Sequence, residues 1–358
     1  MDDAGRRVLV TGGAGFVGGN LAVRLATRHP DWELVAFDNL SRRGSELNLP
    51  RLHDARVEFV HGDVRSLTDM LRLAPADAVV ECSAEPSALA GVDGDTRYIV
   101  DTNLVGAYNC LELARRDGAH VVFLSTSRVY PYATLDRAAY QEAPTRFELA
   151  SEQELPGISA DGVSEGFPLD GPRTLYGATK LAAELLVTEY RKMFGMRATI
   201  DRCGVIAGPW QMGRVDQGVF TYWLLGHYFR RELRYIGYGG AGKQVRDLLH
   251  VDDLVDLVED QLLRPEHWDG ATVNVGGGPH CSLSLLETTE LCAELTGHTL
   301  PVRASGETRP GDVRIYLSDC ARLAGLTEWR PRRSARDVLA DTLKWVAANE
   351  RVVRATLA

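Results

Sequence analysis

The chain has 358 residues with 45% apolar side chains, enough for one large domain or two modest domains with a full core. Its net charge of −9 argues against a nucleic-acid-binding surface, which needs clustered Lys and Arg. No apolar run reaches transmembrane length, residues 1–3 open acidic rather than signal-like, and the six cysteines show no C-x-x-C pair. We therefore expect a cytoplasmic protein with reduced thiols and no membrane contact. The nine histidines form no H-E-x-x-H pattern, so no metal site is expected.

The N-terminal region has the order strand, glycine loop, helix. Apolar residues 8–10 precede the run TGGAGFVG and a helix predicted over 16–27, which ends before Pro30. Glycines at 12, 15 and 18 allow a tight turn and close backbone approach to a pyrophosphate, whose charge the helix N-terminus favours. The spacing is one residue wider than the standard dinucleotide fingerprint, and a glycine turn without a ligand is the alternative.

Two acidic residues follow the next two strands. Asp38 ends the strand predicted over 34–37, where a carboxylate accepts hydrogen bonds from a ribose diol and repels a 2′-phosphate. This position predicts NAD over NADP, a preference that Arg42 and Arg43 would soften. Asp63, after the strand at 57–60, is placed to meet the adenine, and its alternative role is the N-cap of a helix that starts near Ser66.

Strands and helices alternate through the first 200 residues. Further strands are predicted near residues 78, 121 and 199, and helices over 98–116 and 176–194. This pattern predicts an α/β, Rossmann-type fold in which helices cover both faces of a parallel sheet. The acidic, turn-rich segment 131–173 interrupts the alternation, and we expect it to form a lid over the substrate site, with a flexible linker as the alternative.

Tyr176 and Lys180 lie four residues apart in LYGATKLAAELL and therefore share one helical face. An adjacent ammonium favours the phenolate, so we expect Lys180 to lower the pKa of Tyr176 and make it a base for an alcohol. The spacing by itself is a weak signal, because a surface Tyr packed on a Lys stem looks the same.

From TGGAGFVG to RPGDV, the chain resembles the extended short-chain dehydrogenase/reductase family, whose members act mostly on nucleotide sugars with bound NAD. The resemblance implies a catalytic triad of Thr126 (in LSTSRVY), Tyr176 and Lys180, and a helix asparagine, Asn103, that supports the catalytic face. It further implies cofactor contacts from Gly12, Gly15, Phe16, Val17, Asp38, Asn39, Ser41, Arg42, Asp63, Val64, Ser83, Ala84, Asn103, Ser125, Tyr176, Lys180 and Cys203.

The same resemblance implies two interleaved domains. Residues 1–202 form the NAD-binding domain, with a return segment at about 246–275, and residues 203–245 and 276–358 bind the nucleotide sugar. Arg246 in GKQVRDLLH matches an arginine that clamps the diphosphate, Arg309 is a second candidate, and Gln217 lies where relatives hold the base. A solvated surface charge is the alternative for each arginine. The neighbouring apolar residues are expected in the core rather than as a stacking platform: Met212, Phe220, Tyr222 and Trp223.

The residues after Thr126 bear on the reaction. Related 4,6-dehydratases carry an Asp-Glu pair there and uronate decarboxylases a Glu, whereas this chain has Ser127 and Arg128, which we place beside the substrate. Neither side chain is a carboxylate acid or base, so the resemblance implies redox chemistry without dehydration or decarboxylation.

The runs FDNLSRRGSELNL, VDQGVF and GKQVRDLLHVDDL resemble the CDP-tyvelose (CDP-paratose) 2-epimerases more closely. This implies inversion at C2 of a CDP-sugar by oxidation and hydride return, in a homodimer paired through the helices at 98–116 and 176–194. The stretch VECSAEPSALAG departs from the pattern, because Glu81 replaces a histidine and Cys82 to Ala84 replace a small apolar run. Epimerases or oxidoreductases of UDP-, GDP- or dTDP-sugars, and a non-catalytic NAD sensor, are the alternatives.

Overall fold

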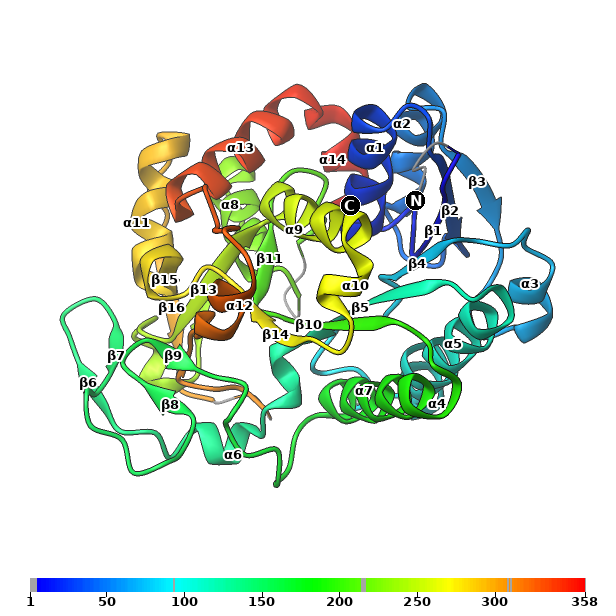
Figure 1. The fold of residues 1–358 in the computed structure, drawn as a ribbon. Coiled ribbons are helices and arrows are strands. Elements are labelled where there is room, and N and C mark those ends of the chain that lie inside the picture. Colours follow the sequence, from blue (N-terminus) through cyan, green and yellow to red (C-terminus); the bar gives the residue numbers. More distant parts are fainter. Residues whose placement is uncertain (1–4, 93, 214–216, 308, 310, 358) are drawn as a thin grey trace.

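A seven-stranded parallel sheet forms the centre of the larger part of the molecule (Figure 1). A computed structural model describes residues 5–92, 94–213, 217–307, 309 and 311–357. The strands, in sheet order, are β14 (Thr272–Val275), β10 (Ala198–Cys203), β5 (His120–Thr126), β4 (Ala78–Glu81), β1 (Arg7–Thr11), β2 (Glu33–Asp38) and β3 (Glu58–His61). This order reverses direction between β1 and β4, the switch point at which doubly wound sheets bind ligands, so the predicted Rossmann-type fold is confirmed.

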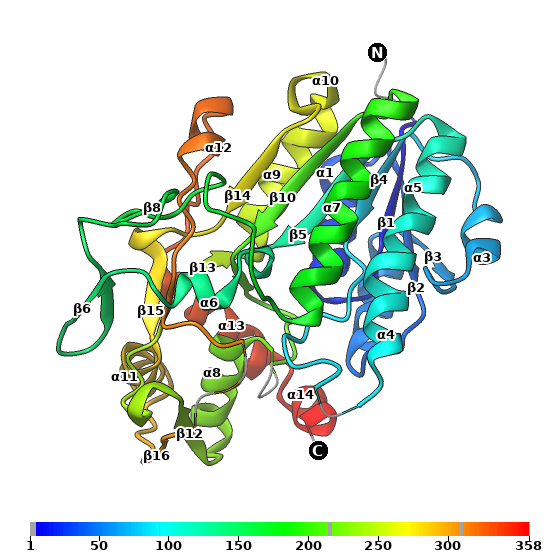
Figure 2. The same cartoon turned by 90° about the horizontal axis from the view of Figure 1, so that it is seen from below.

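Helices cover both faces of this sheet (Figures 1 and 2). Helices α1 (Phe16–Arg28) and α9 (Val251–Leu263) pack on one face, and α5 (Gly106–Asp117) and α7 (Leu175–Phe194) pack on the other. Side chains alternate between the faces along each strand: Val8 and Val10 belong to the core under α1, and Leu9 belongs to the core under α7. Both faces are buried, as parallel sheets require.

Helix α7 places Tyr176 and Lys180 in its first two turns. The Thr174 hydroxyl accepts a hydrogen bond from the Gly177 N–H at 3.4 Å and caps the helix, and Gly195 ends it with a φ of +67°. The helix predicted over 98–116 is instead three consecutive pieces, α4 (Thr96–Val100), the π-helical turn η2 (Asp101–Val105) and α5. Asn103 lies in η2, and π-turns of this kind are frequent at functional sites.

The smaller part of the molecule is built on a second sheet. Its strands are β11 (Val205–Ala207), β13 (Val245–His250), β15 (Ser282–Ser284) and β17 (Ile315–Tyr316), and β12 (Leu233–Ile236) pairs with β16 (Val302–Ser305) beside it. Its helices are α8 (Val219–Phe229), α11 (Leu285–Thr296) and α13 (Ala335–Ala348), whereas α12 (Ala321–Leu326) packs against β14 and places Leu323 in the core of the large sheet. Strand β13 belongs to this sheet, so the chain returns to the large sheet through α9, α10 (Pro265–Trp268) and β14. The boundaries of the two interleaved domains that were proposed from the sequence stay a prediction.

The segment 131–173 is folded. It contains α6 (Tyr132–Leu135) and two hairpins, β6 (Tyr140–Glu142) with β7 (Phe147–Leu149) and β8 (Ile158–Ser159) with β9 (Gly162–Val163). The N–H of Val163 donates to the Leu317 carbonyl at 2.8 Å, and the N–H of Phe147 donates to the Lys243 carbonyl at 2.9 Å. These contacts anchor both hairpins to the smaller part of the molecule, so the flexible-linker alternative is wrong.

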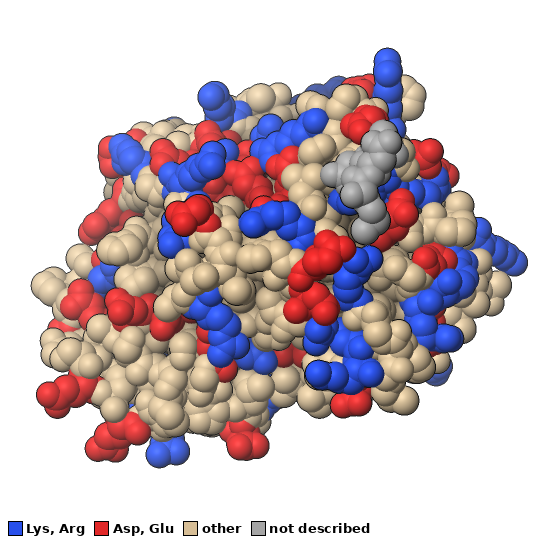
Figure 3. Space-filling model, viewed as in Figure 1, with Lys and Arg blue, Asp and Glu red and all other residues tan. Residues whose placement is uncertain are grey.

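The C-terminal helix connects the two parts. Helix α14 (Glu350–Leu357) places the Ala355 carbonyl 2.7 Å from Nη2 of Arg43, in the loop after β2. The same loop leads into η1 (Ser45–Asn48) and α2 (Leu49–Asp54), and the remaining large-sheet helix is α3 (Leu67–Leu71). On the face that Figure 3 shows, Lys and Arg are interspersed with Asp and Glu. Within the described ranges, no helix combines the length and the apolarity needed to span a membrane.

Candidate active site

The glycine-rich loop lies between β1 and α1, next to the end of β4. Gly12 has a φ of +61°, and a Cβ atom on Gly18 would lie 2.3 Å from the Gly12 carbonyl oxygen, so both positions require glycine. The helix N-cap, Gly15, supplies no side-chain hydrogen bond to the first turn of α1. The N-terminus of α1 is therefore uncapped, and the glycines let a ligand approach its backbone closely. Both features fit the pyrophosphate of a dinucleotide.

The acidic residues after β2 and β3 have different partners. Asp38 is buried and accepts hydrogen bonds from the N–H groups of Ala14, at 3.1 Å, and Leu40, at 2.7 Å, which joins it to the glycine loop. Burial raises the pKa of Asp38 against these bonds. Asp63 accepts from Asn39 at 3.0 Å and from Arg65, and although burial opposes them, these partners lower its pKa to about 2. Ser66 caps α3, so the alternative N-cap role of Asp63 is wrong.

A cavity of about 630 Å³ lies between the ends of the large-sheet strands and the second sheet. Seven predicted cofactor residues line it: Phe16, Val17, Ala84, Ser125, Tyr176, Lys180 and Cys203. The other predicted cofactor residues are outside its wall: Gly12, Gly15, Asp38, Asn39, Ser41, Arg42, Asp63, Val64, Ser83 and Asn103. All five predicted substrate residues line it: Ser127, Arg128, Gln217, Arg246 and Arg309.

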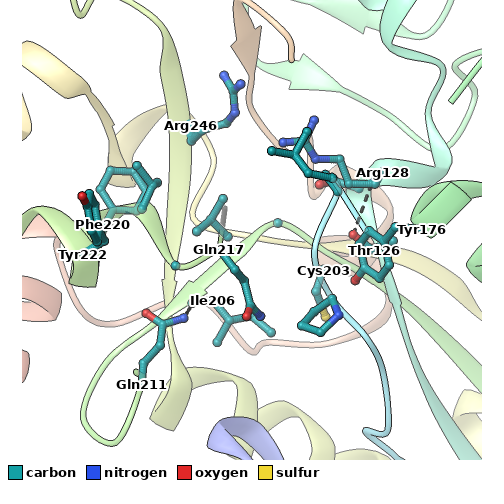
Figure 4. Close-up of a pocket in the computed structure, with 18 of the residues that line it drawn as sticks. Thr126, Arg128, Tyr176, Cys203, Ile206, Gln211, Gln217, Phe220, Tyr222 and Arg246 are labelled. Carbon is teal, nitrogen blue, oxygen red and sulfur yellow. Dashed lines mark hydrogen bonds between the residues drawn. The ribbon is translucent and has the colours of Figure 1, made fainter. Parts of the chain in front are cut away.

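Thr126 and Tyr176 of the predicted triad meet at one end of this cavity (Figure 4), and Lys180 also lines it. Thr126 ends β5, and its hydroxyl accepts the N–H of Arg128 at 3.2 Å and also hydrogen-bonds Tyr176. Lys180 lies on α7 one turn beyond Tyr176, and its Nζ is 3.0 Å from Oε2 of Glu81. Tyr176 and Thr126 therefore lie side by side, with a charged lysine behind them.

The expected lowering of the Tyr176 pKa is wrong for the protein alone. Burial raises the pKa of Tyr176 above 10.0, and the opposing effects of Lys180, the Thr126 hydrogen bond and Arg128 do not outweigh it. Lys180 is also paired with Glu81 at 3.0 Å, an interaction that the spacing of Tyr176 and Lys180 does not reveal. Lys180 still acts in the predicted direction, and only the net shift differs.

Asn103 supports the site through its neighbours. Its Oδ1 accepts the N–H of Glu85 at 2.7 Å, and its Nδ2 donates to the Glu85 carbonyl at 3.1 Å and to Thr179 Oγ1 at 3.2 Å. It thus ties the loop after β4 to α7, one residue before Lys180. Both the supporting role and a direct cofactor contact of Asn103 stay predictions.

Known proteins share this fold over nearly the whole chain. The sequence profile of the NAD dependent epimerase/dehydratase family matches residues 8–276. This chain belongs to that family. CDP-paratose 2-epimerase from Salmonella typhi is 30% identical over 361 residues, covering 96% of this chain and 99% of the relative. dTDP-glucose 4,6-dehydratase from Mycolicibacterium smegmatis is 32% identical over 353 residues, covering 96% and 94%.

A solved structure agrees with the sequence comparisons. The UDP-glucose 4-epimerase of Thermus thermophilus, in complex with NAD, superposes with a TM-score of 0.75 at 25% identity, covering 95% of this chain and 99% of that one. As a member of the epimerase/dehydratase family, the chain is an enzyme that uses NAD, as predicted. The roles of individual residues stay predictions.

The part of the cavity wall that is predicted to bind substrate contains several arginines. The Arg246 Nη2 atom is 2.7 Å from Oδ1 of Asp312, and Arg128 Nη1 donates to the Gly311 carbonyl at 2.9 Å. Burial, followed by the nearby Arg246, lowers the pKa of Arg128. Two guanidinium groups thus converge beside the triad, an arrangement suited to phosphate or carboxylate oxygens.

Gln217 lies between the two ends of the cavity, with Thr126 and Tyr176 at one end and Phe220 and Tyr222 at the other (Figure 4). Its Oε1 accepts a hydrogen bond from Arg42, in the loop after Asp38. Phe220 and Trp223 are buried in the core as expected, although both also line the cavity. One predicted cofactor residue, Arg42, is therefore hydrogen-bonded to one predicted substrate residue, Gln217.

The sequence missed several wall residues and misplaced one segment. Gln211, Glu232 and Arg234 line the cavity outside any motif, and Cys82 and Gln244 line it from within VECSAEPSALAG and GKQVRDLLH without having been predicted as ligand contacts. The segment 131–173 contributes nothing to the wall of this cavity; it reaches only a neighbouring pocket of about 30 Å³ beside Arg128. The lid expectation is thus wrong for the main cavity, because Phe147 of one hairpin packs against Val245 and Ile315 of the second sheet and Val163 of the other bonds to Leu317.

Proposed function

We propose that the protein is a nucleotide-sugar epimerase that inverts C2 of a CDP-3,6-dideoxyhexose. The observation that carries the reaction type is the pair Ser127 and Arg128, which occupies the cavity wall beside Thr126. The carboxylates of the described wall are Glu232 and Asp312, and each is paired with an arginine rather than with the triad. Water loss needs an acid and a base at the sugar. The described wall beside the triad offers Tyr176 but no carboxylate, which favours epimerisation over dehydration.

The triad would divide the work as follows. Tyr176 takes the proton of the reacting hydroxyl and later returns it, Thr126 orients that hydroxyl, and Lys180 favours the tyrosinate electrostatically. NAD, held by the glycine loop and Asp38, would supply hydride exchange with the sugar carbon. The keto-sugar would then rotate in the cavity before it is reduced. The cavity volume of about 630 Å³ is in the range of pockets that enclose small-molecule ligands.

The fit to the cofactor rests on the glycine loop and on Asp38. The loop and the uncapped N-terminus of α1 would hold the pyrophosphate, and Asp38 would accept hydrogen bonds from the adenosine ribose. On the substrate side, Arg246, Arg309 and Arg128 would hold the diphosphate, and Gln217 lies toward the base. The similarity to CDP-paratose 2-epimerase supports the CDP-sugar.

The proposal is tested by proton NMR of the purified protein with CDP-paratose in deuterated water, without added NAD. We expect CDP-tyvelose signals to grow with no deuterium at C2, because hydride leaves and returns without exchange with solvent. Deuterium at C2 would contradict this mechanism. No reaction from a protein that contains NAD would reject the CDP-sugar, and UDP-, GDP- and dTDP-sugars would be screened next, because the stretch from Glu81 to Ala84 departs from the pattern of the 2-epimerases.

A homodimer paired through α5 and α7 is proposed on the outer surface of these helices. Large apolar side chains are exposed there, including Leu185 at 62% and Met193 at 69%, together with Val105, Tyr108 and Phe194. Such a patch is typical of an interface. We expect Leu185→Glu to convert a dimer into a monomer in analytical ultracentrifugation. Leu263→Glu, on α9 at the opposite face of the sheet, is the control that should leave the dimer intact.

A further inference from the structure

Glu81 is a buried carboxylate at the carboxyl end of β4, immediately behind the catalytic helix. We propose that Glu81 is a positioning residue that keeps the Lys180 ammonium protonated and fixed beside Tyr176. The consequence for turnover rests on the redox function proposed above, whereas the effect on Lys180 does not. Glu81 is outside the cavity wall while Lys180 and Tyr176 line it, so Glu81 acts through Lys180 rather than on substrate.

The geometry makes Glu81 the partner on which Lys180 depends. Nζ and Oε2 are 3.0 Å apart, and the side chains are 2% and 1% exposed. Within the described part of the chain, Glu81 is the only carboxylate at salt-bridge distance from Lys180. The Phe123 ring lies 4.4 Å from Nζ on the next strand, where register pairs Glu81 with Phe123. The ammonium is thus held between a carboxylate and an aromatic face.

The other oxygen of Glu81 does not compete for a different cation. Oε1 is buried without a hydrogen bond from the described residues. The Ser83 N–H also hydrogen-bonds the carboxylate, and Lys180 is its cationic partner among the described residues. Removing it would leave an ammonium in an apolar site, and a buried lysine without a counter-charge releases its proton well below its ordinary pKa.

The remaining titratable groups around the pair are neutral at pH 7. They are Tyr176 on α7, Cys82 after β4, Cys110 on α5 and Cys203 on β10, and burial raises the pKa of each. Burial also lowers the pKa of Lys180, but the charge of Glu81, followed by Tyr176 and the Glu81 hydrogen bond, outweighs burial, and the net pKa lies above 10.5. None of these four groups can replace Glu81 as a counter-charge.

The test observes Lys180 directly and needs no substrate. The chain contains four lysines, Lys180, Lys192, Lys243 and Lys344, so NMR of protein labelled with ¹³C at lysine Cε resolves them, and Lys180→Met identifies the Lys180 signal. In the wild type we expect Lys180 to remain protonated at the pH where the other three begin to titrate. In Glu81→Gln we expect its midpoint to fall by about two pH units or more. Glu81→Asp, which keeps the charge at a shorter reach, should give a smaller shift.

Two results would overturn the proposal. One is a Lys180 midpoint in folded Glu81→Gln that equals the wild-type value. The other concerns the wild type alone, and so holds even if Glu81→Gln does not fold: a Lys180 midpoint below those of the other lysines. Glu189→Gln, an exposed change on the same helix, is the matched control and should leave Lys180 unchanged. Failure of the CDP-sugar assay would not affect any of these readouts.

Discussion

Replacing Tyr176 by Phe is expected to lower kcat by about 10²–10⁴-fold, the usual range for losing a general acid–base group. The substitution removes one hydroxyl from a ring that lines the cavity beside Thr126, so NAD content and folding should be unchanged. The measurements are turnover of the accepted nucleotide sugar and the absorbance of NAD released on denaturation.

The matched control for Tyr176→Phe is Tyr222→Phe, because Tyr222 lines the opposite end of the same cavity (Figure 4). It should change KM more than kcat. Full activity in Tyr176→Phe would sink the assignment of Tyr176 as the base. Loss of NAD together with loss of activity would instead indicate that the Tyr176 hydroxyl is needed to hold the cofactor.

Replacing Lys180 by Met is expected to abolish activity and to lower the free energy of unfolding by about 3–5 kcal/mol, because it leaves the Glu81 carboxylate buried and unpaired. Burial already raises the pKa of Glu81 above 4.5 against the influence of Lys180. Without Lys180 the pKa of Glu81 rises further. A carboxyl whose pKa is raised by folding stabilises the folded state at pH values below its unfolded-state pKa. This stabilisation is lost as the pH rises through the folded-state pKa. The defect should therefore be small near pH 5 and large near pH 8, measured by urea unfolding.

The double variant Glu81→Gln/Lys180→Met separates stability from catalysis. Removing both charges eliminates the unpaired carboxylate, so we expect most of the lost stability to return and its pH dependence to disappear, while activity stays absent. If the two single changes add without coupling, the ion pair contributes nothing to the folded state. The same cycle in the presence of NAD shows whether the cofactor depends on the pair.

The sequence predicted the layers of the larger part because local patterns determine them. Apolar strands such as 8–10 are buried on both faces of a parallel sheet, and the helix with Tyr176 begins at a capping Thr174 and ends at Gly195. The glycine loop and Asp38 were predictable for the same reason, since backbone conformation at Gly12 and the end of a strand are local properties. The triad followed from spacing together with the resemblance.

Other features depend on residues far apart in the chain. Glu81 and Lys180 are 99 positions apart and meet because β4 lies next to β5 beneath α7. The sequence shows a charged residue at the end of an apolar strand, but not its partner. The hairpins of 131–173 are in the same situation, because their short strands are stabilised by pairing with Lys243 and Leu317 rather than by local periodicity.

The sequence by itself thus determined the Rossmann-type sheet, the glycine loop and the predicted reacting side chains. All of these follow from short-range backbone preferences and from the spacing of residues along strands and helices. Tertiary structure alone decided the electrostatics of the site. The net pKa of Tyr176 lies above its ordinary value because burial there exceeds the effect of a lysine whose charge Glu81 balances. Desolvation and counter-charge depend on what surrounds a group in space, and spacing along a chain does not contain that information.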